Sequence, residues 1–369
     1  MAKTAIYILT QQGAMTAENL IQRLDADIYV PPAVEGFCSS AKPIPYDSLR
    51  ALIAKTFTAY RQHVFVTAAG VAVRCIAPHL KDKTIDPAVV VMDQHGRHVI
   101  SILSGHLGGA NALAQEVASI TGGQAVITTA TDMENLPALD ILALECNLTI
   151  ANIKAVAKVN SALLAGRTVL VDDPGNALQL KESAWKELFV FTGTPEFASL
   201  TTEEAAAMAR VTVTPTIVPL SETNLVLHPK ILHVGIGCRR GAKARTITGV
   251  ILNALEQLEL SPGSIADIAS VDVKRYEKGL IETAASFDVP LRFFSAKELD
   301  SIPVTSPSHK AQEVFGVDGV CEPSAMLAAG ENALLCLPKR IIQGVTIAIA
   351  QEITQGEPSL AQSTPNSRD

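Results

Sequence analysis

The 369-residue chain is poor in the features that mark several common classes of protein. Aromatic residues make up only 4%, and the net charge is −7. General nucleic-acid binding needs a basic face and aromatic platforms, so no nucleic-acid partner is expected. No run of about 18 uninterrupted apolar residues occurs, so we expect no transmembrane helix and no membrane partner.

Cysteine and histidine are present but lack the spacing of metal sites. The six cysteines form no CxxC pair, which excludes the usual zinc motifs and a disulfide framework. The eight histidines show no ligand spacing on one helix, so no protein-bound metal is expected. The start, MAKTAIYILTQQG, resembles a first strand rather than a signal peptide. We therefore expect a cytoplasmic, reduced protein.

The chain is rich in small aliphatic residues arranged as alternating strands and helices. It is 48% hydrophobic and 18% charged, which suits well-packed cores. The pattern predicts an α/β fold, with two larger α/β domains of mostly parallel sheets and a small α/β linker domain. We place the domains at 1–147, 148–227 and 228–352, and expect the polar tail 353–369 to be disordered.

The segment His98–Asp132 organises the N-terminal domain. The apolar run 98–103 predicts a strand, the sequence Ser104-Gly-His-Leu-Gly-Gly109 a loop, and the residues after it a helix. A further strand follows Gly122-Gly123, which completes a β-loop-α-β unit. Its polar residues follow strand ends, where open α/β sheets bind ligands. The alternative is that the glycines only form a tight turn and that His106 caps a helix, without binding a ligand.

Basic residues gather near the loops that join strands to helices. They are Arg74, Lys81, Lys83 and Arg97 in the first part, and Arg239, Arg240, Lys243 and Arg245 in the last. Helix N-termini with glycine-rich approaches bind anions through unpaired N–H groups and the helix dipole. In a chain that is acidic overall, this clustering favours an anionic small molecule, against the alternative of solvated surface charge.

The loop after the strand at 231–235 permits two other interpretations. Gly235, Gly237 and Gly241 suggest a dinucleotide loop, but the spacing is not GxGxxG and no acid follows at a strand end. Cys238 beside two arginines is either a thiolate nucleophile or, as we favour, a small apolar residue.

Six segments carry a resemblance to one known family: GVAVRCIAPHLKDK, DPAVVVMDQHGRHVISILSGHLGGANALA, VITTATD, VGIGCRRG, SVDVKRYEKGL and VCEPSAMLAAG. Together they resemble the cobalt-precorrin-5A hydrolase family (CbiG) of anaerobic cobalamin synthesis. The resemblance is weakest before residue 45 and across the middle segment. One departure is Ala68-Ala-Gly-Val71, where relatives often carry Thr-Gly-Ile. The C-terminal domain also resembles a stand-alone protein of the aerobic pathway.

The resemblance implies a hydrolase that opens the δ-lactone of cobalt-precorrin-5A and releases acetaldehyde, giving cobalt-precorrin-5B with a contracted macrocycle. The substrate carries many carboxylates, which suit the basic clusters. Cobalt travels with the substrate, so no cofactor of the protein is expected. A homodimer and other corrin-pathway enzymes are candidate partners.

Position and chemistry assign the roles of the site residues. His106 is the candidate general base, and Ser104 with the N–H groups of Gly108 and Gly109 the candidate oxyanion donors. Asp132 either orients His106 or protonates the leaving carbon, and Glu322 is a second acid/base candidate, with the macrocycle expected between the domains. The predicted substrate-binding residues are Arg74, Lys81, Lys83, Ser104, Gly105, Gly108, Gly109, Asn111, Thr129, Gly237, Arg239 and Arg240.

Two alternatives stay open at this stage. One alternative is a tetrapyrrole carrier that catalyses no reaction. The other is a nucleotide-dependent enzyme that uses the 235–245 loop. Paired polar groups such as His106 with Asp132 favour an enzyme, since a carrier needs only the basic residues.

Overall fold

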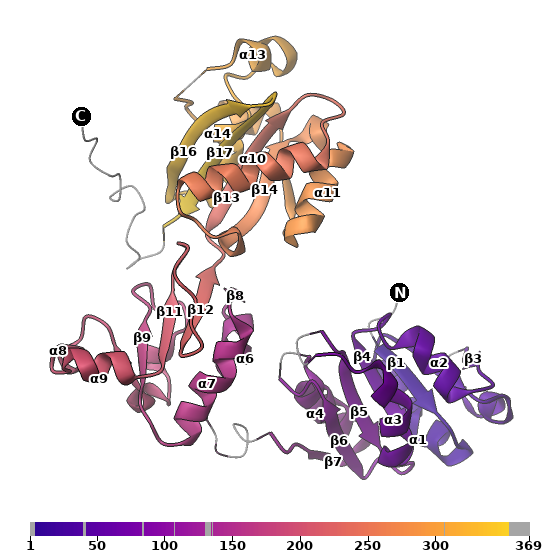
Figure 1. Ribbon diagram of the computed structural model, residues 1–369. Coiled ribbons are helices and arrows are strands. Elements are labelled where there is room, and N and C mark those ends of the chain that lie inside the picture. Colours follow the sequence, from indigo (N-terminus) through magenta and orange to yellow (C-terminus); the bar gives the residue numbers. More distant parts are fainter. Residues whose placement is uncertain are drawn as a thin grey trace. The chain divides into compact units, whose positions relative to one another are not determined.

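A computed structural model describes residues 4–39, 42–82, 85–106, 108–129, 134, 136–305 and 307–353. The chain divides into two compact units, Met1–Ile141 and Leu142–Asp369 (Figure 1). Each unit has an α/β architecture, as the sequence predicts. Among the described residues, no helix combines the length and apolar character needed to cross a membrane.

The first unit contains a seven-stranded sheet in the order β3-β2-β1-β4-β5-β6-β7. Neighbouring strands are parallel except β5 and β6, which form an antiparallel hairpin, as the apolar run 88–92 and the turn sequence Gln94-His-Gly96 predict. The strands are β1 (Thr4–Ile8), β2 (Ala26–Val30), β3 (Ile44–Pro45), β4 (Gln62–Val66), β5 (Ala88–Met92), β6 (His98–Leu103) and β7 (Gln124–Val126).

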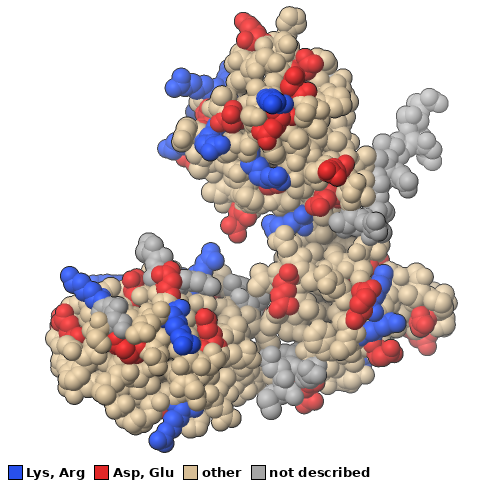
Figure 2. Space-filling model, turned by 180° about the vertical axis from the view of Figure 1, so that it is seen from behind, with Lys and Arg blue, Asp and Glu red and all other residues tan. Residues whose placement is uncertain are grey.

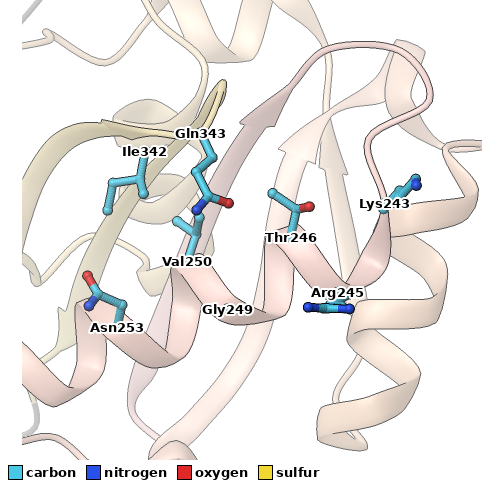
Figure 3. Close-up of a pocket in the computed structure, with 8 residues that line it drawn as sticks. All are labelled: Lys243, Arg245, Thr246, Gly249, Val250, Asn253, Ile342 and Gln343. Carbon is cyan, nitrogen blue, oxygen red and sulfur yellow. The ribbon is translucent and has the colours of Figure 1, made fainter.

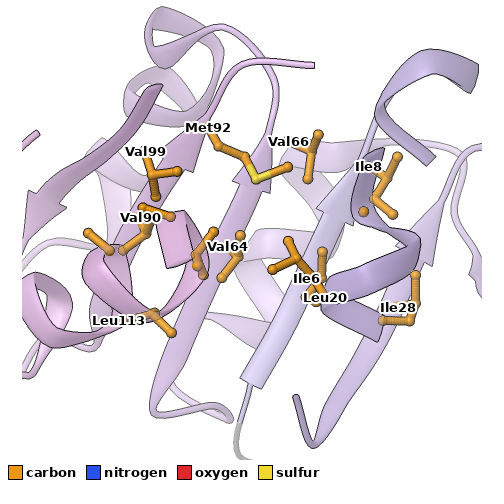
Figure 4. Close-up of a cluster of buried hydrophobic side chains, with 14 of the residues drawn as sticks. Ile6, Ile8, Leu20, Ile28, Val64, Val66, Val90, Met92, Val99 and Leu113 are labelled. Atoms are coloured by element: carbon orange, nitrogen blue, oxygen red, sulfur yellow. The ribbon is translucent and has the colours of Figure 1, made fainter. Parts of the chain in front are cut away.

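Side chains that alternate along the strands form two cores, one on each face of this sheet. Ile6, Val64 and Val90 belong to the core shown in Figure 4, which packs against helices α1 (Gln11–Arg23) and α4 (Ala110–Thr121). Tyr7 and Phe65 point to the other face and pack against α2 (Leu49–Thr56) and α3 (Ala69–Ile76). Because both faces are covered, the strands are almost continuously apolar.

The sequence of the first unit predicts helices over 16–24 and 46–61, and both differ in length from the helices observed. The helix expected over 16–24 begins earlier, at Gln11, because the Thr10 hydroxyl accepts a hydrogen bond from the Gly13 N–H and caps the helix. The helix expected over 46–61 is the shorter α2, capped by Ser48. Short 3₁₀ segments, η1 (Pro32–Phe37) and η2 (Ala77–His79), complete the unit.

The second unit begins with the end of α6 (Leu139–Glu145) and holds two five-stranded sheets. The middle sheet has the order β10-β9-β11-β12-β8, and α7 (Ile153–Leu164) packs against it. Its strands are β8 (Leu148–Ile150), β9 (Val169–Asp172), β10 (Phe189–Phe191), β11 (Arg210–Val213) and β12 (Asn224–Pro229). Its short helices are η3 (Leu180–Glu182), η4 (Lys186–Leu188), α8 (Pro195–Ala198) and α9 (Thr202–Ala207).

The C-terminal sheet has the order β15-β14-β13-β17-β16. β13 (Leu232–Cys238), β14 (Ile265–Val271) and β15 (Leu291–Phe294) are parallel. The sequence predicts a closing strand pair at 333–337 and 345–350, and β16 (Ala333–Ile342) and β17 (Val345–Glu352) form this pair as an antiparallel hairpin. Helices α10 (Ala244–Gln257) and α11 (Lys278–Phe287) cover one face, and α14 (Cys321–Ala329) the other. The remaining helices are η5 (Pro262–Ser264), η6 (Asp272–Lys274), α12 (Ala296–Asp300) and α13 (His309–Phe315).

Candidate functional site

The loop between β6 and α4 is bent tightly back onto the start of its helix. Ser104 has a φ of +56°, and Gly109, which precedes α4, a φ of +83°. The carbonyl oxygens of Ser104 and Gly105 accept hydrogen bonds from the N–H groups of Ala110 and Asn111, at 3.1 and 3.0 Å. The predicted strand, loop and helix are therefore present, and the loop lies at the carboxyl end of β6.

Two of the predicted oxyanion donors in this loop are already engaged. The Ser104 hydroxyl donates to the carbonyl oxygen of Asp86 at 2.8 Å. The Gly109 N–H donates to the carbonyl oxygen of His106 at 2.8 Å. Because each group has one proton, neither reaches a ligand without giving up that bond. Among the described residues no acceptor is recorded for the Gly108 N–H, so Gly108 is the better candidate of the three.

Close packing explains the glycines of this loop. A Cβ on Gly105 would lie 2.8 Å from Asn111 Oδ1, and one on Gly108 would lie 2.3 Å from Ser104 Cβ. Asn111 is buried and donates through Nδ2 to the Thr129 hydroxyl at 3.0 Å. The structure therefore brings these predicted binding residues together, and its glycines allow the loop to pack on itself.

The other predicted residues of the first unit have different surroundings. His106 is half-buried in the loop. Arg74 is exposed and donates to the carbonyl oxygen of Gly70 in its own helix, and Lys81 is exposed next to Asp86, whose carboxylate accepts its backbone N–H. Asp132 and Lys83 lie outside the described residues.

A cavity of about 810 Å³ opens at the carboxyl end of β13; we call it the C-terminal cavity. Its size is within the range of small-molecule sites, about 300–1,000 Å³. Gly237 and Cys238 of β13 line it, with Cys321 of α14 and Thr346 of β17. The predicted binding residues Gly237, Arg239 and Arg240 all belong to this lining.

Basic side chains dominate the charge of the C-terminal cavity. They are Arg239, Arg240, Lys274, Lys310 and Lys339, and Glu277 is the one carboxylate among the lining residues described. Glu277 pairs with Lys274, Oε2 to Nζ, at 3.4 Å. No ion pair among the described residues involves Arg239, Arg240 or Lys310. The cavity can therefore receive several anionic groups at once.

An exposed apolar wall accompanies these charges. Val273, Tyr276 and Val314 line the cavity and are 64%, 89% and 57% exposed. Large exposed apolar side chains beside basic groups suit a ligand with an apolar body and acidic arms. On the face in Figure 2, by contrast, basic and acidic side chains are interspersed.

Two glycines inside strand β13, Gly235 and Gly237, serve packing within the domain. A Cβ on Gly235 would lie 1.8 Å from the carbonyl oxygen of Cys321, and one on Gly237 would lie 2.3 Å from Thr346 Oγ1. These glycines let α14 and β17 approach β13 closely, whereas a dinucleotide loop uses its glycines to approach a pyrophosphate. The geometry therefore disfavours the nucleotide interpretation.

The thiols that line the cavity are not activated nucleophiles. Burial raises the pKa of the Cys238 thiol above its usual value, and burial raises the pKa of Cys321 to about 11. A thiol is nucleophilic as the thiolate. For Cys238 the raised pKa disfavours the thiolate alternative and agrees with the small apolar role that we favour, because desolvation is the largest effect on its pKa.

Glu322 is engaged within the protein and does not line the cavity. It is only 2% exposed, and its carboxylate accepts hydrogen bonds from the Thr305 N–H, the Thr305 hydroxyl and the Lys339 N–H. These bonds hold the loop at Thr305 and strand β16 to the start of α14. The structure thus gives Glu322 a structural environment instead of the acid/base environment we predicted.

A second cavity, of about 610 Å³, lies between α10 and the β16–β17 hairpin. In Figure 3, Thr246, Gly249 and Asn253 lie along α10, and Gln343 of the hairpin lies opposite them. Lys243 and Arg245, which we grouped with the substrate-clamping residues, line this second cavity. The single basic set predicted for the C-terminal loop is therefore divided between two surfaces.

Sequence reasoning missed several residues of the C-terminal cavity. Lys274, Tyr276 and Glu277 belong to the segment SVDVKRYEKGL, which carried the family resemblance and was a usable sign. Lys310 and Lys339 are isolated in the sequence, and no pattern marks them.

Among the described residues, no group of three His, Cys, Asp or Glu side chains is placed to hold a metal ion.

Comparisons with known proteins match nearly the whole chain. The family model described as cobalamin synthesis G N-terminal matches residues 51–132. The models described as cobalamin biosynthesis central region and cobalamin synthesis G C-terminus match residues 137–229 and 232–350. A cobalt-precorrin-5A hydrolase of Priestia megaterium is 32% identical over 94% of both chains. A cobalt-precorrin-5A hydrolase of Salmonella typhimurium strain LT2 is 35% identical over 94% of this chain and 96% of its own.

A third relative is similar to one part alone. Protein CobE of a Sinorhizobium species is 30% identical over 125 residues, which are 33% of this chain and 81% of that protein.

Proposed function

We propose that this chain, which belongs to the CbiG family of cobalamin synthesis, is a cobalt-precorrin-5A hydrolase. Two relatives with that name, each at least 32% identical, match it over 94% of its length. The observation in the structure that supports the proposal best is the C-terminal cavity, which combines five basic side chains with an exposed apolar wall. A tetrapyrrole with peripheral carboxylates has the complementary chemistry.

The reaction we propose opens the δ-lactone of the substrate with water and releases the two-carbon fragment as acetaldehyde. Opening the lactone needs a base that activates water and a donor that stabilises the developing oxyanion. Departure of the fragment then needs a proton at the ring carbon that it leaves. Cobalt enters and leaves with the ring, so the protein itself needs groups that bind, orient and move protons.

We assign the general base to His106, on the β6–α4 loop. Imidazole is the commonest general base, and the loop lies at the shared carboxyl end of β6 and β7, where Asn111 contacts Thr129. The Gly108 N–H is our candidate for the oxyanion donor, since the Ser104 hydroxyl donates to the Asp86 carbonyl oxygen and the Gly109 N–H to that of His106. Arg239, Arg240 and Lys310 are assigned to substrate carboxylates.

The test uses purified protein dialysed against a chelator and mixed with the lactone-bearing cobalt intermediate, without nucleotide. The proposal predicts one acetaldehyde released for each ring converted. Activity that disappears on dialysis and returns with zinc or NAD would refute the cofactor-free mechanism.

A carrier function is the second candidate, and the content of the C-terminal cavity favours it. Its thiols have raised pKa values and its described carboxylate is paired, so this cavity offers binding groups without an activated nucleophile. Protein CobE is also similar to one third of this chain, which covers most of the length of CobE. A carrier would change the absorption spectrum of the ring on binding without releasing acetaldehyde.

A further inference from the structure

The β13–α10 loop, Arg239–Lys243, carries two basic side chains of the C-terminal cavity but has no regular structure of its own. Among the described backbone hydrogen bonds, one lies within this loop: the Ala242 N–H donates to the Arg239 carbonyl oxygen at 3.3 Å and closes a turn. At the tip, Gly241 has a φ of +75°. The direction in which the arginines point therefore depends on what holds this turn from outside.

Glu277, just before α11, holds the tip of the turn. Its Oε1 accepts the Gly241 N–H at 2.9 Å, and its Oε2 pairs with Lys274 Nζ at 3.4 Å. The Lys274 and Glu277 side chains are only 12% and 10% exposed. The carboxylate is thus fixed by two partners in a partly desolvated place, where charged hydrogen bonds are stronger than at the surface.

The start of α11 fits against the same loop through its backbone. A Cβ on Gly279 would lie 2.0 Å from the carbonyl oxygen of Ala242 and 3.2 Å from the Ala244 nitrogen. The Thr283 hydroxyl, one turn further on, donates to the Gly279 carbonyl oxygen at 2.7 Å. Lys274, Glu277 and Gly279 therefore form one supporting surface for the loop, all within the segment SVDVKRYEKGL.

We propose that Glu277 is a positioning residue, which holds the β13–α10 loop so that Arg239 and Arg240 face anionic groups of the substrate in the C-terminal cavity. The inference rests on the proposed function, because it takes the substrate to be the anion. It gives the one carboxylate among the described lining residues a role in binding a polyanion.

A purely electrostatic role for Glu277 predicts the opposite change in KM. If Glu277 acted only through its charge, removing it would make the cavity more positive, and the KM for an anionic substrate would fall. If Glu277 positions the loop, removing it misplaces two basic side chains, and KM rises. The sign of the change in KM therefore separates the two roles.

The experiment compares Glu277→Ala and Glu277→Gln with wild type in the full chain, measuring kcat and KM for acetaldehyde release and hydrogen exchange at the Gly241 amide. We expect Glu277→Ala to raise KM by about tenfold, the loss of roughly one charge-assisted contact, with kcat little changed. The Glu277→Gln variant keeps a side-chain oxygen that can accept the Gly241 N–H, so its KM should lie between the KM of wild type and that of Glu277→Ala. Gly241 exchange should accelerate at least severalfold in the alanine variant.

Glu282→Gln is the matched control. Glu282 pairs with Lys278 at 3.6 Å on the same helix, but both side chains are largely exposed and lie outside the cavity lining. This variant should leave KM and Gly241 exchange unchanged. An unchanged or lower KM in Glu277→Ala, or unchanged Gly241 exchange, would overturn the inference. A wild-type protein that releases no acetaldehyde would instead refute the proposed function, and the exchange measurement would still test the loop.

Discussion

Arg240 and its neighbour Arg239 are the residues most directly suited to hold substrate carboxylates. Both line the C-terminal cavity, and both are exposed. A hydrogen bond to a charged group contributes about 1.5–3 kcal/mol. We expect Arg240→Ala to raise KM by about ten- to a hundredfold with little change in kcat, measured by steady-state acetaldehyde release. Lys278→Ala, which removes an exposed basic side chain outside the cavity, is the control; equal KM values in the two variants would contradict the assignment.

His106 should act on the chemical step more than on binding. General base catalysis contributes typically about 10²–10⁴-fold, so His106→Asn should lower kcat by about that factor while KM changes modestly. His95→Asn, in the exposed β5–β6 turn, is the matched control. If His106 only stabilises the loop, the variant will unfold at a lower temperature while single-turnover acetaldehyde release stays near that of wild type.

Among the strands of the first unit, β1 and β4 share a buried polar contact. Tyr7 of β1 hydrogen-bonds His63 Nδ1 of β4 at 3.0 Å, and His63 Nε2 lies 3.1 Å from the Phe57 carbonyl oxygen. Burial lowers the pKa of His63 from 6.5 to about 4. The imidazole of His63 is therefore neutral in the folded sheet. As the pH falls, it becomes protonated in the unfolded chain before it does so in the folded protein.

The sign of the pH dependence follows from this difference. Since the folded pKa lies below the unfolded one, the contribution of His63 to the free energy of unfolding should stay constant above about pH 6.5 and decrease as the pH falls towards 4. The full loss is about 3 kcal/mol, from about 1.4 kcal/mol for each pKa unit. Urea unfolding followed by tyrosine near-ultraviolet circular dichroism measures it, because four of the five tyrosines lie in the first unit.

A His63→Gln variant provides the comparison for that measurement. It should be less stable at neutral pH but should lose the part of the pH dependence between 4 and 6.5. An exposed histidine, His95, replaced by glutamine should leave the dependence unchanged. A wild-type slope equal to that of His63→Gln would show that the buried imidazole does not control the stability of this sheet.

The elements were predictable where a local pattern determines them. The apolar run of β6, the glycines before α4 and the closing β16–β17 hairpin all follow from residues close in sequence. Partners of polar groups were not predictable, because they come from distant segments. The Ser104 hydroxyl donates to Asp86, 18 residues earlier, and Glu322 accepts bonds from Thr305 and Lys339 on either side of it. These long-range contacts decide whether a polar residue is available to a ligand.

Over the whole molecule, the sequence predicted the α/β class and the family, whereas the cavity became visible only in three dimensions. Lys274 of η6, Lys310 of α13 and Lys339 of β16 come from three different elements of the C-terminal domain and line one cavity. A basic residue that is isolated in sequence carries no sign of such convergence. The family resemblance therefore identified the ligand chemistry earlier than the individual side chains did.

Hydrolysis of the lactone by water is the central claim, and isotope labelling tests it most directly. Wild-type protein in excess is mixed with cobalt-precorrin-5A in ¹⁸O-labelled water, and acetaldehyde and the ring product are quantified by mass spectrometry. We predict one acetaldehyde per ring and one ¹⁸O atom in the carboxylate formed from the lactone, because water attacks the carbonyl. A bound, unchanged ring without acetaldehyde, or a product carboxylate without label, would contradict the account.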